Sequence, residues 1–331
     1  DASTDGEQEV IKKYMGMHFD YSPNSVSFDK ETDYAYIHYA RHKENKNCYF
    51  AVLFLKENLY SKKEGFKKMI TQRISKLREK MMENNVQAYI IPTSDFHETE
   101  YVCEYFACRK YMSGFTGSAG VLVVLLDKAA LWTDGRYFIQ AANQLEGTGI
   151  DLMRMGQPGV PELDAYIVEN LKENDTVGFD GRVMNTKDAL AYKSVFDLAH
   201  LNMNVNLDLV NDVWTDRPEL PSTPTFHYSE KFAGESMESK LSRLRAFLKE
   251  NKVDSIVLTS VDQIAWLYNL RAHDIPNFPV ALAYSIVSLD SASIYMDASR
   301  LDELSEQEFS KNNVTVCGYN DMYEATKALN G

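Results

Sequence analysis

The sequence predicts an α/β fold made of two tandem duplicated domains, each a mixed β-sheet flanked by helices. The main observation is an internal repeat: residues 75–95 read SKLREKMMENNVQAYIIPTSD, and residues 242–262 read SRLRAFLKENKVDSIVLTSVD. Leu77 and Leu244 are equivalent in the two copies, so the offset is 167 positions. A period of this length is too long for a solenoid repeat and is typical of a duplicated domain.

Each copy predicts, in order, an amphipathic helix, a polar segment with asparagine that ends the helix, an apolar strand and a carboxylate residue. In the first copy, apolar residues recur at three- and four-residue spacing, which predicts a helix with one buried face: Ile70, Ile74, Leu77 and Met81. The strand 88–91 follows, and Pro92 ends it. Helices mixed with strands in both copies indicate the α/β class.

A β-hairpin is predicted after this unit in each copy. In the first copy the apolar runs 120–126 and 129–133 flank a two-residue polar turn, and in the second copy the runs 281–289 and 293–297 do the same. The rest of the first copy alternates between predicted helices and one predicted strand. The helices are expected at 140–145, 160–171 and 186–199, and the strand at 176–180.

These patterns divide the chain into segments. We expect a first domain over 66–216, a proline-rich linker over 217–236 and a second domain over 237–331. Three of the nine prolines lie within 214–224, and proline lacks a backbone donor and fixes φ, so this stretch is expected to be extended and stiff. Residues 1–65 belong to neither repeat and form an extension of unknown role, with a hairpin expected from 33–41 and 48–55 around the polar residues 42–47.

Composition argues against several classes of partner. The chain has 331 residues and a formal net charge of −13, whereas nucleic acids and anionic membranes are bound through clustered Lys and Arg. No apolar run approaches the roughly 20 residues that span a bilayer. Four cysteines are too few for a disulfide framework in a chain this long. We therefore expect a cytoplasmic protein with no nucleic-acid or membrane partner.

The densest run of unusual residues lies in the first copy. Three glycines at 114, 117 and 120 resemble a phosphate loop, but they precede a strand instead of opening a helix, so we interpret them as a close turn of the backbone. His97 and two nearby cysteines include metal-ligand types without the second ligand pair of a zinc site, so we expect no metal here. The candidates for a structural or interface role are His97, Arg109, Asp134, Arg136 and Tyr137. Asp134 and Arg136 can pair across Gly135 and fix the turn, or contact a ligand or another subunit.

Charged residues of the second copy follow the apolar run 264–270 and stand near two prolines. This placement suits the rim of a cleft as well as a solvated loop, and both interpretations stay open. The candidates for a substrate cleft are Arg271, Asp274 and Tyr284.

Together these runs resemble the two N-terminal domains of aminopeptidase P, the X-Pro aminopeptidase branch of the creatinase/prolidase family. The resemblance covers roughly residues 66–331 and rests on AYIIPTSDFHETEY (88–101), SGFTGSAG (113–120), LWTDGRYFIQAA (131–142), VWTDRP (213–218) and QIAWLYNLR with Asp274 (263–274). It implies two mixed-sheet domains flanked by helices, which agrees with the duplication. Two residues depart from the family pattern: Ala272 stands in place of Gly, and Phe278 stands where some members have Asn before Pro279. Both departures argue against substrate contact by Arg271 and Asp274.

The resemblance also implies a catalytic domain of pita-bread fold with two divalent metal ions, Mn or Zn, on two Asp, one His and two Glu. We expect that domain to be missing from this chain, because none of its seven histidines forms a His-Gly pair. The whole protein would remove the N-terminal residue from peptides with proline second and act as a homodimer. The chain alone would be non-catalytic and would shape the substrate cleft and the dimer interface. The alternatives are a stand-alone binding or scaffold protein without peptidase activity, and part of a prolidase- or creatinase-type enzyme.

Overall fold

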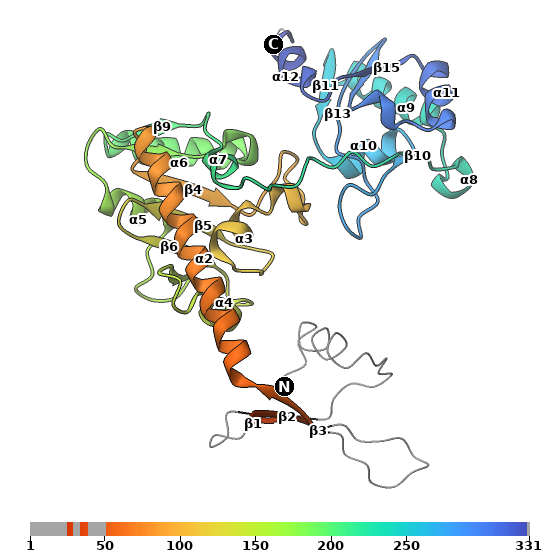
Figure 1. Ribbon diagram of the computed structural model, residues 1–331. Helices are drawn as coiled ribbons and strands as arrows, with labels where there is room; N and C mark the ends of the chain where they lie inside the picture. The colour runs from red at the N-terminus through yellow and green to blue at the C-terminus, as the bar shows by residue number, and fades with distance from the viewer. Residues whose placement is uncertain (1–24, 29–33, 39–50, 330–331) are drawn as a thin grey trace, which may run out of the picture. The chain divides into compact units, whose positions relative to one another are not determined.

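The computed structural model describes the backbone of residues 25–28, 34–38 and 51–329 and the side chains of residues 64–329 (Figure 1). The chain divides into two compact units, Asp1–Thr71 and Gln72–Gly331. In the first unit β1 (Ser25–Phe28), β2 (Tyr34–His38) and β3 (Ala51–Leu55) form an antiparallel sheet in that order. The predicted pairing of 33–41 with 48–55 is confirmed as β2 with β3, whereas β1 was not predicted. The expected turn at 42–47 lies outside the described residues.

The second unit contains both copies of the repeat, named domain I and domain II here. Domain I begins with the C-terminal part of α2 (Lys56–Glu83), in which Ile74, Leu77 and Met81 are buried as predicted. Its mixed sheet has the order β7-β6-β5-β4-β8-β9. Antiparallel pairs join β4 (Ala88–Pro92) to β5 (Val121–Leu125) and β5 to β6 (Ala129–Thr133). Parallel pairs join β7 (Asp151–Arg154) to β6, β8 (Thr176–Gly178) to β4, and β9 (Asn202–Asn204) to β8.

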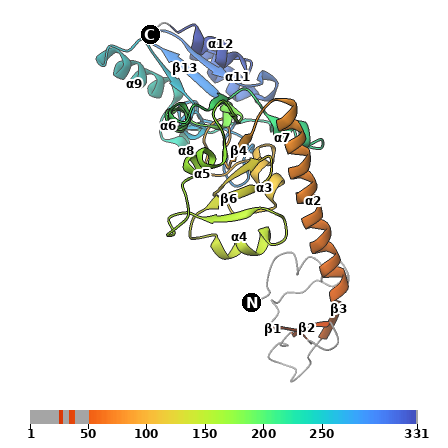
Figure 2. The same cartoon turned by 90° about the vertical axis from the view of Figure 1, so that its left-hand side faces the viewer.

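Helices cover both faces of the domain I sheet. Figure 2 shows α2 on one side and α5 (Leu163–Asn170) with α6 (Thr186–Leu198) on the other. Apolar residues of α5 and α6 share a buried cluster with β4, β5 and β6, which includes Ile90, Trp132 and Phe196. The shorter elements are α3 (Cys108–Ser113), α4 (Phe138–Leu145), α7 (Leu209–Val213) and the 3₁₀ turns Glu104–Phe106 and Gly181–Val183.

Domain II has a smaller mixed sheet of the order β11-β13-β14-β15. Its antiparallel strands are β11 (Ser255–Leu258), β13 (Tyr284–Ser288) and β14 (Ala292–Tyr295), and β15 (Val314–Cys317) joins β14 in parallel. Its helices are α9 (Met237–Glu250), α10 (Val261–Leu267), α11 (Glu303–Lys311) and α12 (Asp321–Lys327), with a 3₁₀ turn at Ala298–Arg300. β10 (Phe226–His227) pairs with β12 (Leu270–Arg271), and β10 and α8 (Glu230–Ala233) lie within the predicted linker 217–236.

The duplication extends to single hydrogen bonds. Arg78 Nε donates to the carbonyl oxygen of Leu125 at 2.8 Å, and the equivalent Arg245 Nε donates to that of Ser288 at 3.2 Å. Each guanidinium therefore attaches the first helix of its domain to the same end of the second strand. At the helix ends, Asn85 and Lys252 are equivalent and both adopt a positive φ, of 54° and 56°. The predicted α/β class with two duplicated mixed-sheet domains is thus confirmed.

Candidate functional site

A pocket of about 630 Å³ lies where the loop after β4 meets the start of α10. These two segments are equivalent in the repeat, since each follows the first strand of its domain. The volume falls within the roughly 300–1,000 Å³ that is usual for small-ligand sites. The lining residues are His97, Glu98, Thr99, Glu100, Tyr101, Ser260, Val261, Asp262, Pro276, Asn277 and Phe278.

His97 joins the two domains beneath this pocket. Its ring is buried, with Nδ1 2.8 Å from the carbonyl oxygen of Thr259 and Nε2 2.7 Å from the hydroxyl of Tyr319. A carbonyl oxygen can only accept, so Nδ1 carries the proton and Nε2 accepts from Tyr319 when the ring is neutral. Burial lowers the pKa of His97 below its ordinary value, which favours this neutral form.

Asp95 fixes the shape of the loop that carries His97. One carboxylate oxygen accepts from the backbone N–H groups of His97 and Thr99 at 2.8 and 3.0 Å, and the other accepts from the Thr99 hydroxyl. Between them Glu98 adopts a positive φ of 56°, which is unusual for a residue with a side chain. The loop therefore has a defined conformation at the edge of the pocket.

Tyr284, a predicted cleft residue, belongs to the same cluster as His97. Its ring centroid lies 4.3 Å from that of His97 and 5.1 Å from that of Tyr319. Its hydroxyl donates to the carbonyl oxygen of Phe96 at 3.2 Å. Burial raises the pKa of Tyr284, so the phenol stays protonated at neutral pH.

Asp274, another predicted cleft residue, is a buried member of an ion pair. Oδ2 accepts from Arg300 at 2.5 Å and from the backbone N–H of Leu282 at 2.8 Å. Oδ1 accepts from the hydroxyl and the backbone N–H of Thr223 at 2.7 and 3.1 Å. These bonds fix both ends of the loop between Asp274 and Leu282, in which Pro276, Asn277 and Phe278 line the pocket.

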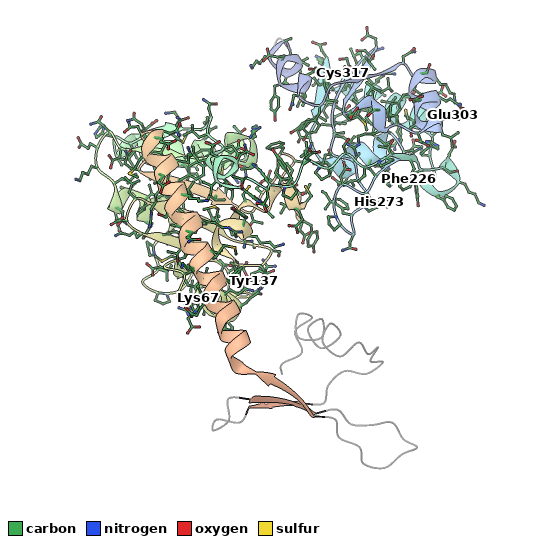
Figure 3. The ribbon with its side chains drawn as sticks, viewed as in Figure 1. Lys67, Tyr137, Phe226, His273, Glu303 and Cys317 are labelled. Carbon is green, nitrogen blue, oxygen red and sulfur yellow. The ribbon has the colours of Figure 1, made fainter. Side chains whose placement is uncertain are left out.

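Arg271 lies outside the pocket lining. Its guanidinium donates to the carbonyl oxygens of Ala265 and Leu270 at 2.5 and 2.9 Å and stacks over the ring of Tyr228 at 4.6 Å. Burial lowers the pKa of Arg271. The cation therefore completes the C-terminal end of α10, where helix carbonyls lack partners. The neighbouring His273 is exposed, and its ring packs against Phe226 (Figure 3).

Arg109 holds the glycine-rich loop of domain I. It donates to the carbonyl oxygens of Phe115, at 2.5 Å, and of Gly117, and to the hydroxyl of Thr93 at 2.9 Å. Burial lowers the pKa of Arg109 to about 10. A β-carbon at Gly117 would lie 2.2 Å from the ring of Phe115, so the glycine permits close packing, in agreement with the interpretation as a close turn.

The predicted pair of Asp134 and Arg136 is formed at the surface. The guanidinium donates from Nε and Nη2 to the two carboxylate oxygens, both at 2.8 Å. This bidentate pair lowers the pKa of Asp134 to about 2. Arg136 Cζ lies 5.1 Å from the ring centroid of Tyr137, which is labelled in Figure 3, and the Tyr137 hydroxyl lies 2.7 Å from that of Ser118. The next residues include Ile139, which is 81% exposed.

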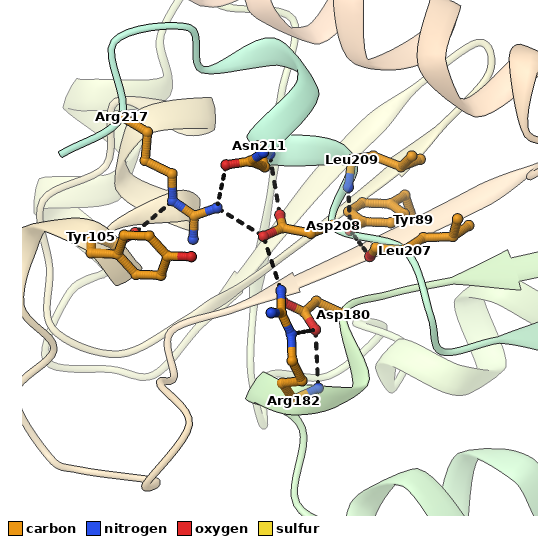
Figure 4. A network of polar contacts seen from close by, with 9 residues as sticks. All are labelled: Tyr89, Tyr105, Asp180, Arg182, Leu207, Asp208, Leu209, Asn211 and Arg217. Atoms are coloured by element: carbon orange, nitrogen blue, oxygen red, sulfur yellow. Dashed lines mark hydrogen bonds and ion pairs between the residues drawn. The ribbon is translucent and has the colours of Figure 1, made fainter. Parts of the chain in front are cut away.

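A network near the linker was not predicted (Figure 4). Arg217 donates to Asp208 Oδ2 at 2.8 Å and to the carbonyl oxygen of Tyr105 at 2.9 Å. Arg182 contacts Asp208 at 3.3 Å and forms a bidentate pair with Asp180. The network ties the start of the linker to domain I. Its sequence signal is the motif VWTDRP (213–218), which does not by itself indicate an ion-pair network.

Among the described residues, no group of three or more His, Cys, Asp or Glu side chains is arranged to hold a metal ion. No helix in the described part of the chain is long and apolar enough to cross a membrane. The side chains of residues 64–329 therefore do not fit a metal centre.

Comparisons with known proteins agree with this architecture. Two family models described as "Creatinase/Prolidase N-terminal domain" match residues 73–206 and 216–331. The chain is similar to a probable Xaa-Pro aminopeptidase P of Pyricularia oryzae, with 37% identity over 262 residues, covering 78% of this chain and 42% of that protein. It is also similar to one of Neurospora crassa, with 40% identity over 265 residues, covering 78% and 38%. A third relative is aminopeptidase P2 of Arabidopsis thaliana, with 37% identity over 276 residues, covering 81% and 38%.

A solved structure is similar as well. It is the X-prolyl aminopeptidase from Caenorhabditis elegans, described as a cytosolic enzyme with a di-nuclear active site. The TM-score is 0.74 at 32% identity, covering 78% of this chain and 43% of that chain. This chain thus spans about two fifths of the length of the relatives that it matches.

Proposed function

Because this chain belongs to the creatinase/prolidase family through two N-terminal domains, we propose that it is the N-terminal part of an Xaa-Pro aminopeptidase. The whole protein would release the first residue from peptides with proline in second position. The observation that carries the proposal is 35–40% identity to Xaa-Pro aminopeptidase P sequences over most of both domains. Proline removes the N–H of the scissile amide and restricts its geometry, so such bonds require a dedicated site.

In this proposal, the described residues build the wall of the substrate cleft and do not carry out the chemistry. The pocket between domains I and II has the size of a ligand site. Hydrogen bonds of Tyr284 and Asp274 fix two of the loops that line it. Asp274 and Tyr284 would act as positioning residues, and Arg271 would position α10. The exposed loop with Arg136 and Tyr137 would contact the second subunit of a homodimer.

The proposed enzyme would use two divalent ions, Mn or Zn, bound by a domain other than these two. When bound, such ions activate water for attack on the peptide bond. The C. elegans enzyme is cytosolic and has a di-nuclear site, which supports a cytoplasmic, metal-dependent peptidase here.

The activity can be tested with the full-length protein. After chelation and re-addition of Mn²⁺ or Zn²⁺, we expect release of alanine from Ala-Pro-Ala, measured by mass spectrometry, and at least about 100-fold less from Ala-Ala-Ala. Residues 1–331 alone should show no turnover while circular dichroism confirms that they are folded. Failure of the full-length protein with either ion, or metal-dependent cleavage by residues 1–331, would contradict the proposal.

A further inference from the structure

The pocket beside His97 has an acidic wall. Its described lining contains three carboxylates, those of Glu98, Glu100 and Asp262, and no lysine or arginine. His97 does not balance them, because burial lowers the pKa of its ring and keeps the imidazole neutral at neutral pH. The wall therefore carries a negative charge that its own residues leave uncompensated.

Two of the three carboxylates are free to meet a ligand. The side chains of Glu100 and Asp262 are exposed and make no hydrogen bond or ion pair within residues 64–329. Among the carboxylates that raise the pKa of Arg136, Asp134 contributes most, since it binds the guanidinium through both oxygens, and Glu100 contributes least. A positive charge that enters the pocket therefore displaces no described cation of the chain.

Glu98 is held in place at the edge of the pocket. Its Oε1 accepts from the side-chain amide of Asn185 at 2.8 Å, and its Oε2 has no partner among the described residues. The backbone is fixed as well, because Asp95 accepts from the N–H groups on either side of Glu98. This carboxylate is positioned before a ligand arrives, which lowers the entropic cost of binding.

Apolar and aromatic side chains form much of the remaining wall. They include Val261, Phe278 and Tyr101, which is 56% exposed. Within the described residues, neither ring stacks on a cation. Arginine and lysine match such a wall, since their aliphatic stems pack against apolar groups while the charged heads are attracted to carboxylates and aromatic faces. Arginine fits best, because its planar guanidinium also stacks on rings and binds carboxylates through two N–H groups.

The ligand has to be larger than a metal ion. In the described part of the chain the carboxylates are not grouped to coordinate one. The volume of about 630 Å³ is also far more than an ion fills. A second hollow of about 150 Å³ shares Glu100 and Tyr101 with the pocket and continues along Thr116, Gly117 and Ser118. The two hollows together suit an extended chain with one side chain in the pocket.

We propose that this pocket binds an arginine or lysine side chain of an extended peptide. Glu98, Glu100 and Asp262 attract the charge, and Phe278 and Tyr101 contact the stem and the planar head. The inference deepens the proposed function and rests on it in one respect, namely that the peptide is a substrate. Because the side chains of residues 64–329 do not fit a metal centre, the reacting bond lies elsewhere and the basic residue lies downstream of the proline.

A titration of this chain with a capped peptide tests the site without any reaction. We expect acetyl-Ala-Arg-Ala-amide to shift the methyl resonances of Val261 in NMR spectra of residues 1–331. Replacing the arginine by citrulline keeps the shape but removes the charge, and it should raise the Kd at least about tenfold. The affinity should also fall with added salt, since exposed charges are screened. Equal affinities for the two peptides, or no shift at Val261, would overturn the proposal.

The double variant Glu100→Gln and Asp262→Asn tests the carboxylates. Both side chains are exposed, so the fold should persist, which circular dichroism checks. We expect the variant to bind the arginine peptide at least about tenfold more weakly and the citrulline peptide as the wild type does. Asp290→Asn, at an exposed carboxylate outside the pocket, is the matched control and should bind both peptides as the wild type does. Unchanged arginine binding by the double variant would refute the assignment.

Kinetics of the full-length protein test whether the bound peptide is a substrate. The probes are Ala-Pro-(Gly)n-Arg-Gly and their citrulline counterparts, with n from about one to five, because each residue extends the reach by about 3.3 Å. At one length or more we expect KM to be at least about tenfold lower with arginine, at similar kcat. Equal KM values at every length would overturn the downstream role. Absence of turnover with every peptide, Ala-Pro-Ala included, would instead contradict the proposed function, while the titration still decides the ligand of the pocket.

Discussion

Tyr319 in domain II donates a hydrogen bond to Nε2 of His97 in domain I at 2.7 Å, although 222 positions separate the two residues. The second ring nitrogen of His97 is bonded to the carbonyl oxygen of Thr259, also in domain II. One buried imidazole of domain I therefore spans two separate segments of domain II. The pocket lies directly beside this junction.

Removal of the Tyr319 hydroxyl should weaken the junction. Tyr319→Phe leaves His97 Nε2 buried without a donor, and we expect a loss of about 1–3 kcal/mol in the free energy of unfolding. Urea denaturation followed by fluorescence measures the loss. Tyr101→Phe, at an exposed tyrosine, is the control and should have little effect. Equal effects of both changes would exclude a stabilising role for the His97–Tyr319 bond.

The stability of the protein should depend on pH through His97. Its pKa in the folded state is lowered below 6.5 by burial, although the carboxylates of Asp95 and Asp274 oppose the shift. As pH falls, the unfolded chain therefore binds a proton at His97 before the folded chain does. The part of the free energy of unfolding that depends on neutral His97 is present above about pH 6.5 and is lost below it. We expect the wild type to lose more free energy of unfolding between pH 7.5 and 5.5 than His97→Gln. Parallel curves for the two proteins would contradict this expectation.

The glycine-rich loop should not tolerate a larger residue at position 117. In Gly117→Ala the new methyl group meets the rings of Phe115 and Tyr137 at 2.2 and 2.9 Å. Overpacking of this kind costs about 1–3 kcal/mol, and a corresponding fall in Tm is expected in differential scanning calorimetry. Gly135→Ala is the matched control, since its nearest neighbour would be 3.8 Å away. If the Tm of Gly117→Ala lies within about 1 °C of that of Gly135→Ala, the loop can repack around the new methyl group. A difference of about 1 °C is the limit of significance for a domain of this size.

The buried ion pair under the pocket loop should be essential for the stability of domain II. Asp274→Asn leaves Arg300 buried without its counter-charge, which typically costs about 3–5 kcal/mol. Chemical denaturation checks the loss, with the exposed Asp290→Asn as control. If Asp274→Asn unfolds no more easily than Asp290→Asn, the pair is not what fixes the 276–278 loop.

The surface pair at Arg136 should matter for association more than for folding. The Arg136 side chain is 68% exposed, so Arg136→Ala should leave the Tm of the protein nearly unchanged. If this loop contacts a second subunit, the same change should weaken dimerisation of the full-length protein at least about tenfold in sedimentation analysis. Lys193→Ala, which removes another exposed ion pair, is the control. Unchanged association would place the interface elsewhere.

The sequence predicted the fold well where the pattern of apolar residues was strong. The helices that contain Leu77 and Leu244 were predicted correctly, because apolar residues at three- and four-residue spacing indicate a buried helical face. Strands β7, β9 and β15 were not predicted. The clearest case is β9, of sequence NMN, which carries little apolar signal and is positioned by its pairing with β8. Such strands depend on tertiary contacts that no local pattern records.

The candidate site was predicted only in part, because its contacts join distant segments. A structural or interface role is predicted for His97, but its partners Thr259 and Tyr319 lie 162 and 222 positions away. Arg300, the partner of Asp274, is not among the predicted site residues. A role for Arg271, Asp274 and Tyr284 at the substrate cleft stays a prediction.

The arginine contacts at Arg78 and Arg245 have a consequence for sequence tolerance. In both, the bond is made by Nε, the nitrogen within the arm of the side chain, and lysine has no nitrogen at that position. An exchange to lysine keeps the charge but loses the same contact in each half of the duplicated unit. Variation among natural or laboratory sequences should therefore be restricted at both arginines in the same way, whatever the surrounding residues become.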